Sequence, residues 1–104
     1  MLLAEWRAWW KSSGADQLSN LLRENWDPFG DSSFRTYAEE RLFDLARSLH
    51  EGATLVDVQV FLHDLRRSHW PERTGRKWTS RDRAVATKVV AWYREATGEQ
   101  PGQR

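Results

Sequence analysis

The sequence predicts an all-α fold, a compact bundle of four main helices plus an N-terminal helix, with no sheet. Apolar residues recur at three- and four-residue steps in successive segments, which is the spacing of one helix face. Serine, proline and glycine, which start or stop helices, separate each segment from the next. No alternating pattern typical of a strand runs for more than a few residues.

The first helix is predicted from an apolar stripe at its amino end. The chain then reaches Ser12-Ser13-Gly14, where glycine permits a break and the hydroxyls can cap a following helix. We therefore expect the first helix to end there. The stripe that should face the core consists of Leu2, Leu3, Trp6, Trp9 and Trp10.

The second helix is predicted over residues 15–26 and ends in the turn Trp26-Asp27-Pro28-Phe29-Gly30. Proline disfavours the helical conformation at Asp27, and Gly30 can adopt a positive φ. We expect the Trp26 ring to pack beneath this turn.

The third and fourth helices are predicted from clear end signals. The third covers residues 33–51 and stops at Gly52, while Thr54 and Asp57 resemble a capping box that starts the fourth. Three apolar residues fall outside the inner stripes, which favours a centrally placed helix over a contact with another chain. They are Phe43, Val56 and Val60.

The fifth helix follows a basic connector bracketed by Pro71 and Gly75. Thr79 or Ser80 is the expected cap, which places Asp82 in the first turn, where a carboxylate complements the helix dipole. Gly98 is the expected end. The domain prediction is therefore one helical domain over residues 1–98 and a flexible tail over residues 99–104.

Composition limits the class of protein. The chain has 104 residues, which suits one domain, and no cysteine, which excludes disulfides and thiolate chemistry. No apolar run approaches the ~18 residues needed to cross a bilayer, and the start lacks a basic leader, so we expect a cytoplasmic protein without membrane contact. Residues 1–52 hold six Lys and Arg against nine Asp and Glu, and residues 53–104 hold ten against six.

Enzyme, metal and cofactor functions are not predicted. The three histidines, His50, His63 and His69, do not converge at helical spacing, so we predict no metal site. The carboxylates of the third helix fall on its polar face, where Arg41 and Arg47 can pair with them. No phosphate loop, nucleophile elbow or dinucleotide fingerprint occurs, which indicates neither a cofactor nor a small-molecule substrate.

Most tryptophans lie at core positions of their helices. Trp70 and Trp78 belong instead to the connector, which lacks the helical repeat of apolar residues that would place them in the core. They either fold back as a lid over the core or contact a partner. Arginine and tryptophan dominate interface hot spots, so we predict that the connector binds another protein with an acidic surface. The predicted contact residues are Trp70, Arg73, Arg76, Lys77, Trp78, Arg81 and Arg83.

Nucleic acid is the alternative partner, because phosphates pair with arginine and unpaired bases stack on aromatic rings. The near-neutral net charge of +1 speaks against it. The expected state is a monomer or a weak homodimer.

The turn Trp26-Asp27-Pro28-Phe29-Gly30 resembles the Trp-Asp-Pro-Ile-Gly signature of a family of small bacterial helical proteins of uncharacterised function. Similar short motifs extend the likeness over about residues 18 to 95, although the family's acidic stretch is largely lost in residues 31–37. The resemblance implies an all-helical fold, no known activity, and an immunity-like or accessory role as in some members. Its structural motif corresponds here to Trp26, Asp27, Pro28, Gly30, Tyr37 and Trp92.

Overall fold

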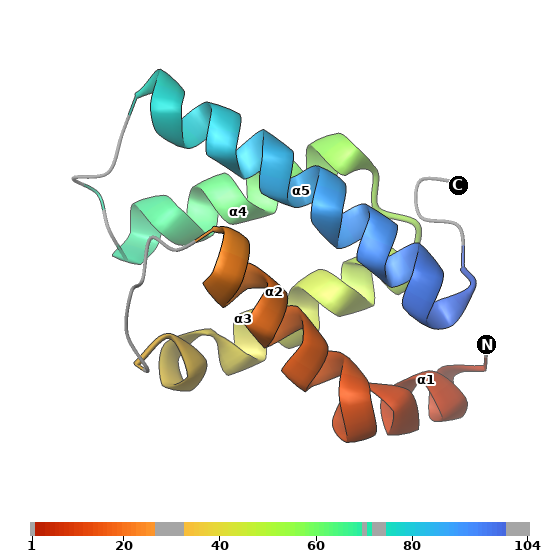
Figure 1. The fold of residues 1–104 in the computed structure, drawn as a ribbon. Helices are drawn as coiled ribbons and strands as arrows, with labels where there is room; N and C mark the ends of the chain where they lie inside the picture. Colours follow the sequence, from red (N-terminus) through yellow and green to blue (C-terminus); the bar gives the residue numbers. More distant parts are fainter. Residues whose placement is uncertain (1, 27–32, 70, 72–74, 100–104) are drawn as a thin grey trace.

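Helices alone build the part of the chain that the structure describes, which confirms the predicted all-α class (Figure 1). The computed structural model describes residues 2–26, 33–69, 71 and 75–99, and of residues 33–40 and 69 it describes the backbone only. The elements are α1 (Leu3–Trp9), a π-helical turn η1 (Trp10–Gly14), α2 (Ala15–Asn25), α3 (Ser33–His50), α4 (Leu55–His69) and α5 (Arg76–Thr97).

The break predicted at Ser12-Ser13-Gly14 is wrong, because α1, η1 and α2 form one uninterrupted helical segment (Figure 1). Gly14 keeps helical dihedrals, with φ −59° and ψ −44°. The Ser12 hydroxyl donates to the Trp9 carbonyl at 3.3 Å instead of capping a new helix. A Cβ at Gly14 would lie 2.9 Å from Trp9 Cη2, so glycine serves here to admit the indole ring and not to stop the helix.

The core lies where this N-terminal segment packs against α3, α4 and α5. Trp6, Trp10 and Trp26 are buried in it, as the apolar stripes predict. Leu2 and Leu3 are 72% and 40% exposed, so their predicted place in the core is wrong. In this segment Trp6 and Trp10, rather than the two leucines, form the face that packs into the core.

The junction of α3 and α4 confirms two predictions of local geometry. Gly52 adopts φ 99°, and its N–H donates to the Leu49 carbonyl at 3.1 Å while the Ala53 N–H donates to Ser48 at 2.8 Å, which is the Schellman arrangement. Thr54 and Asp57 then form the capping box, since each backbone N–H donates to the other's side chain, at 2.9 and 3.1 Å.

Helix α5 begins earlier than predicted. Gly75, at φ 100°, precedes it, and the N–H groups of Trp78 and Thr79 donate to the Gly75 carbonyl. Thr79 and Ser80 therefore lie inside the helix, and Asp82 is a buried residue beyond the first turn, so its predicted place in the first turn is wrong. The predicted end is confirmed, because Gly98 adopts φ 75° and its N–H donates to the Arg94 carbonyl at 2.8 Å.

The three residues outside the predicted stripes do not share one explanation. Phe43 is half-buried and its ring lies 5.8 Å from that of Trp6, so α3 contributes a second face to the core. Val56 and Val60 are 63% and 51% exposed, which contradicts the central-helix prediction for α4. One face of α4 is covered by α5 and the other is open to solvent.

Candidate functional site

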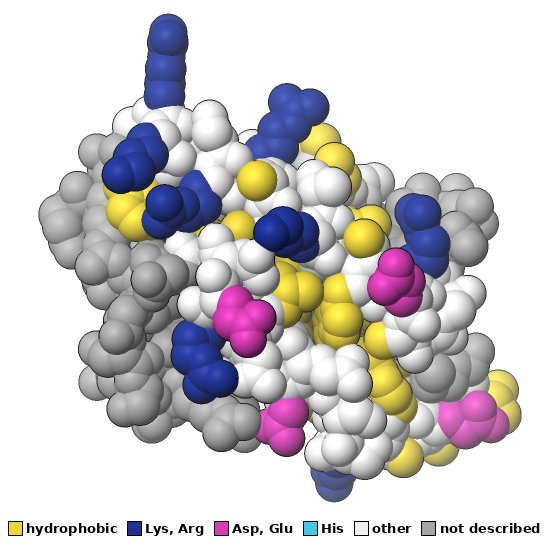
Figure 2. Space-filling view, viewed as in Figure 1, with side chains coloured by type: hydrophobic (Ala, Val, Ile, Leu, Met, Phe, Trp, Pro, Cys, Tyr) yellow, Lys and Arg dark blue, Asp and Glu magenta, His cyan; other side chains and the backbone are white. Residues whose placement is uncertain are grey.

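The exposed side of α5 carries most of the positive charge of the second half of the chain. Its Lys and Arg residues lie on or beside one helix face, and Figure 2 shows dark blue side chains along this helix. Glu95 is the exposed acidic residue on α5, whereas Asp82 is buried. We call this surface the basic face; it consists of Arg76, Lys77, Arg81, Arg83, Lys88 and Arg94.

Several of these cations lack a carboxylate partner. Within residues 2–26, 33–69, 71 and 75–99, Arg76, Lys77, Arg83 and Arg94 make no ion pair. Lys88 donates to the Asn25 side-chain oxygen at 2.7 Å, which links α5 to α2 without neutralising the charge. The basic face therefore projects uncompensated charge into solvent.

Trp78 lies at the edge of the basic face and is half-buried. The guanidinium of Arg81 lies over its ring, 4.9 Å from the centroid, and that of Arg66 lies at 5.8 Å. Such cation–π contacts hold the ring in place. The sequence leaves two alternatives for Trp78, a ring folded back over the core or a ring exposed to a partner. The half-buried ring lies between these two extremes.

A buried charge pair fixes the amino-terminal half of α5 beneath the basic face. The Arg66 Nη2 donates to Asp82 Oδ2 at 2.7 Å, and both side chains are 1% exposed. The Trp26 indole N–H donates to the other carboxylate oxygen at 2.9 Å. His63 Nδ1 lies 3.1 Å from Arg66 Nη2. Helices α2, α4 and α5 therefore converge on one carboxylate.

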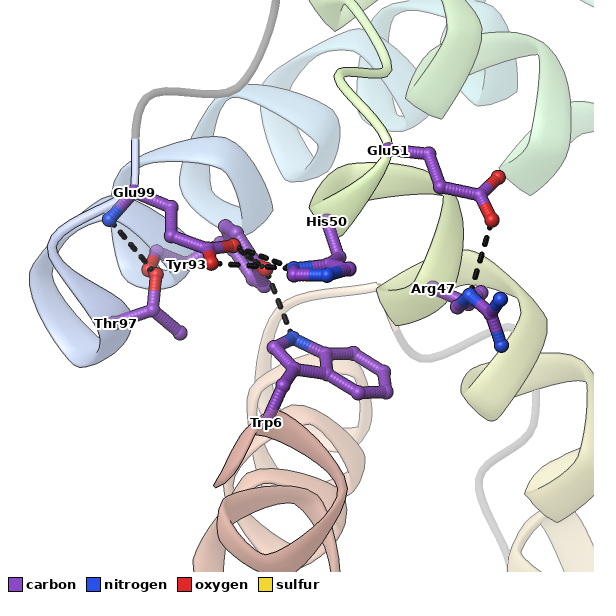
Figure 3. A network of polar contacts seen from close by, with 7 residues as sticks. All are labelled: Trp6, Arg47, His50, Glu51, Tyr93, Thr97 and Glu99. Carbon is purple, nitrogen blue, oxygen red and sulfur yellow. Dashed lines mark hydrogen bonds and ion pairs between the residues drawn. The ribbon is translucent and has the colours of Figure 1, made fainter. Parts of the chain in front are cut away.

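A second polar network joins the two ends of the chain to α3 (Figure 3). The Trp6 indole N–H donates to the Tyr93 hydroxyl at 2.9 Å, and that hydroxyl donates to the Glu99 carboxylate. His50 Nδ1 lies 3.0 and 3.1 Å from the two Glu99 oxygens. Glu99, which the sequence assigns to a flexible tail, is thus held against the domain.

The environment shifts two pKa values in this network. Burial raises the pKa of Tyr93, and the hydrogen bond to Glu99 adds to the rise. Burial by itself would raise the pKa of Glu99, but the hydrogen bonds from Tyr93 and His50 outweigh burial and hold that pKa below its usual value. The network thus keeps a neutral phenol beside an ionised carboxylate.

The predicted site residues fall into two groups. Arg76, Lys77, Arg81 and Arg83 come together on the basic face with Trp78 beside them. Trp70 and Arg73 lie outside the described residues. No group of three or more metal-ligating side chains occurs in the part of the chain that the structure describes, and no helix there is long and apolar enough to cross a membrane.

The predicted structural motif is described in part. Trp26 is completely buried, as expected for a ring beneath the turn. Trp92 is half-buried and donates its indole N–H to Gln17 at 2.9 Å, so its assignment to the core is only partly right. Asp27, Pro28 and Gly30 lie outside the described residues, as does the side chain of Tyr37.

Sequence reasoning missed the residues that carry the two polar networks. Arg66 and Asp82 share the core phase of their helices, Arg66 with Val58, Leu62 and Leu65, and Asp82 with Val85, Ala86 and Val89. Two opposite charges at core positions of neighbouring helices indicate a buried pair, and that signal was available. No comparable pattern connects Glu99 with Trp6, because Tyr93 links them only through the tertiary packing of α1 beside the end of α5.

The comparisons with known proteins add no assignment. No family model, curated protein or solved structure matches the chain. The resemblance of its turn to the Trp-Asp-Pro-Ile-Gly family stays a prediction.

Proposed function

We propose that this chain is a non-enzymatic, cytoplasmic binding module that engages an acidic protein surface through the basic face of α5 and the connector before it. An immunity or accessory role fits such a module, because its action is to occupy a partner surface. The observation that carries the proposal is the concentration of uncompensated Arg and Lys side chains on one exposed helix.

The rigidity of the basic face supports recognition of a folded partner. Arg66 and Asp82 tie α5 to α4, and Trp26 ties it to α2, so the charges stand on a fixed helix. Binding through a helix that is already held in place costs less conformational entropy than binding through a segment that must order on binding. The guanidinium of Arg81 is further positioned by its contact with Trp78. Such a surface is suited to a partner whose carboxylates are also fixed.

The placement of Trp78 favours protein over nucleic acid. A nucleobase needs an open aromatic face on which to stack. Guanidinium groups of Arg66 and Arg81 already lie over the Trp78 ring. An acidic side chain, by contrast, can pair with Arg81 at the edge of the ring without displacing either guanidinium. We therefore treat nucleic acid as the alternative outcome of the experiment.

The test is an affinity capture with charge-reversed chains. Arg76→Glu/Lys77→Glu/Arg83→Glu reverses the basic face, and a matched control applies the same change in charge to α1, η1 and α2. The control is Arg7→Glu/Lys11→Glu/Arg23→Glu, which also changes exposed residues. Captured proteins are identified by mass spectrometry, and the leading candidate is expressed and titrated against all three chains with and without nuclease treatment.

We expect one partner with an acidic surface that binds the native and control chains and binds the reversed chain at least ~30-fold more weakly, equivalent to about 2 kcal/mol. The affinity should fall as salt is added, because exposed charges are screened. Capture that disappears with nuclease would assign the basic face to nucleic acid. Equal binding by all three chains would exclude it as the contact surface.

A further inference from the structure

An apolar groove lies along α1, on a different part of the molecule from the basic face. It is open to solvent along one side and has a volume of about 860 Å³, which falls within the range of small-molecule sites. Trp10 and Phe43 provide its aromatic wall, with ring centroids 6.1 Å apart and planes at 68°. The lining residues are Leu3, Ala4, Arg7, Ala8, Trp10, Lys11 and Phe43.

The groove is open because the helix presents small side chains to it. Ala4 and Ala8 are one turn apart and exposed, so their small side chains leave space beside the larger ones that line the groove. The lining extends from Leu3 to Lys11, roughly 12 Å along a helix. Its shape therefore suits an extended apolar chain.

Among the described residues that line the groove, the charges have one sign. Arg7 and Lys11 are exposed and one turn apart, so their head groups can converge on a single anion. Neither makes an ion pair with any residue the structure describes. The groove lining contains no carboxylate among those residues. Apolar side chains thus adjoin a small cluster of positive charge.

We infer that this groove binds a single-chain aliphatic carboxylate, a fatty-acid anion in its free, monomeric form. The hydrocarbon chain lies over Ala4 and Ala8 against the rings of Trp10 and Phe43, and the carboxylate pairs with Arg7 and Lys11. Burial of the chain supplies the affinity, and the paired cations select an acid over an alcohol of equal length. No feature of the sequence pattern predicts this ligand.

A second copy of this chain fits the charges less well. It would bring Arg7 and Lys11 near their own counterparts if the grooves faced each other, and like charges repel.

The test is an NMR titration of the full, isotopically labelled chain with octanoate and, separately, with octanol. The indole N–H of Trp10 reports occupancy of the groove. We expect octanoate to shift this signal and to bind roughly fivefold more tightly than octanol, because exposed ion pairs contribute modestly. Arg7→Gln/Lys11→Gln should lower the octanoate affinity to that of octanol, while Arg23→Gln/Arg67→Gln, at exposed positions outside both the groove and the basic face, should leave it unchanged.

A second variant tests the shape of the groove without disturbing the core. Ala8→Leu adds a good helix former at an exposed position and fills the groove, so it should weaken both ligands. Ala91→Leu, at an exposed position on α5, is the matched control and should weaken neither.

Four outcomes would overturn the inference. They are equal affinity for octanoate and octanol in the native chain, an unshifted Trp10 signal, a dimer by sedimentation that closes the groove, and binding to anionic phospholipid vesicles without binding to monomeric octanoate. The capture experiment on α5 is independent of these results, because Ala8→Leu leaves the basic face intact.

Discussion

The two ends of helix α5 are held by similar contacts that lead to different chemistry. Towards its amino end, the Trp26 indole donates to Asp82, whose charge is compensated by Arg66 inside the core. Towards its carboxyl end, the Trp6 indole donates to Tyr93, whose hydroxyl passes the interaction to Glu99 at the boundary with solvent. At one end an indole N–H therefore donates to a buried ion pair. At the other end an indole N–H is linked, through Tyr93, to a carboxylate at the solvent boundary.

The two ends therefore stabilise the fold in different ways, one through an ion pair inside the core and the other through a boundary carboxylate whose contribution depends on pH. A buried ion pair with satisfied hydrogen bonds is costly to break from one side, because the remaining charge stays desolvated. A boundary carboxylate with a lowered pKa can be protonated without breaking the core. Most residues of the basic face lie towards the first end, and the link between α1 and Glu99 depends on the second.

The largest effect is expected from removing one member of the buried pair. Asp82→Leu leaves the Arg66 guanidinium desolvated and should cost about 3–5 kcal/mol of unfolding free energy, measured by urea denaturation. Arg66→Met/Asp82→Leu replaces both charges by apolar groups and should return to within about 1 kcal/mol of the native chain. A single variant that loses less than about 1 kcal/mol would mean that water reaches Arg66.

Matched substitutions of the two tryptophans compare the acceptors directly. Trp26→Phe and Trp6→Phe each remove a buried indole N–H and leave a similar cavity. Hydrogen bonds to a charged acceptor contribute more than those between neutral groups, so Trp26→Phe should cost roughly 1 kcal/mol more than Trp6→Phe. Thermal and urea denaturation of both variants measure the difference. Equal losses would show that packing outweighs the acceptor charge.

A smaller change in unfolding free energy is expected from Gly14→Ala in the N-terminal segment, and its sign distinguishes helix propensity from packing. Alanine favours helix over glycine by about 1 kcal/mol, so Gly14→Ala would stabilise an ordinary helical position. Here the added Cβ meets Trp9 Cη2 at 2.9 Å and Trp10 Cε3 at 3.0 Å. Overpacking costs typically ~1–3 kcal/mol, so we expect a net loss of about 1 kcal/mol in urea denaturation. A gain would show that the indole of Trp9 moves aside freely.

The smallest effect is expected at the boundary network, and it depends on pH. Glu99→Gln should cost about 1 kcal/mol near neutral pH, where the native carboxylate is ionised and hydrogen-bonded. The pKa of Glu99 is lowered from its ordinary value of 4.5, so its contribution is present above that value and is lost as pH falls through the folded pKa. Denaturation at about pH 6 and about pH 3 should show the difference between the two chains closing.

The matched control for this experiment is Glu51→Gln. Glu51, which directly follows α3, accepts from Arg47 at 3.0 Å, and its side chain is 58% exposed. Exposed pairs one helical turn apart contribute only about 0.3–0.5 kcal/mol. A loss in Glu99→Gln no larger than in Glu51→Gln, or a loss that does not change with pH, would contradict the assigned role of the network.

The sequence by itself determined the helical class and the local ends of helices. Apolar spacing identified Leu18, Leu22, Leu62 and Leu65 as core residues, because residues three or four positions apart in the sequence share one face of a helix. The capping box of Thr54 and Asp57 and the left-handed Gly52 were predictable for the same reason, since each depends on neighbours a few residues away. The basic residues of α5 could also be listed, but not their common face with its supporting ion pair.

Only the tertiary structure decided where packing between distant residues overrides a local conformational preference. Gly14 and the serines before it are ordinary stop signals, yet the helix continues because burying Trp6 and Trp10 outweighs a glycine penalty of about 1 kcal/mol. Asp82 looks like a surface carboxylate until Arg66, sixteen residues away, compensates it. Glu99 and Trp6 meet through Tyr93, and the groove forms between α1 and α3. These contacts join residues far apart in sequence, and their energies depend on burial and distance that no local pattern contains.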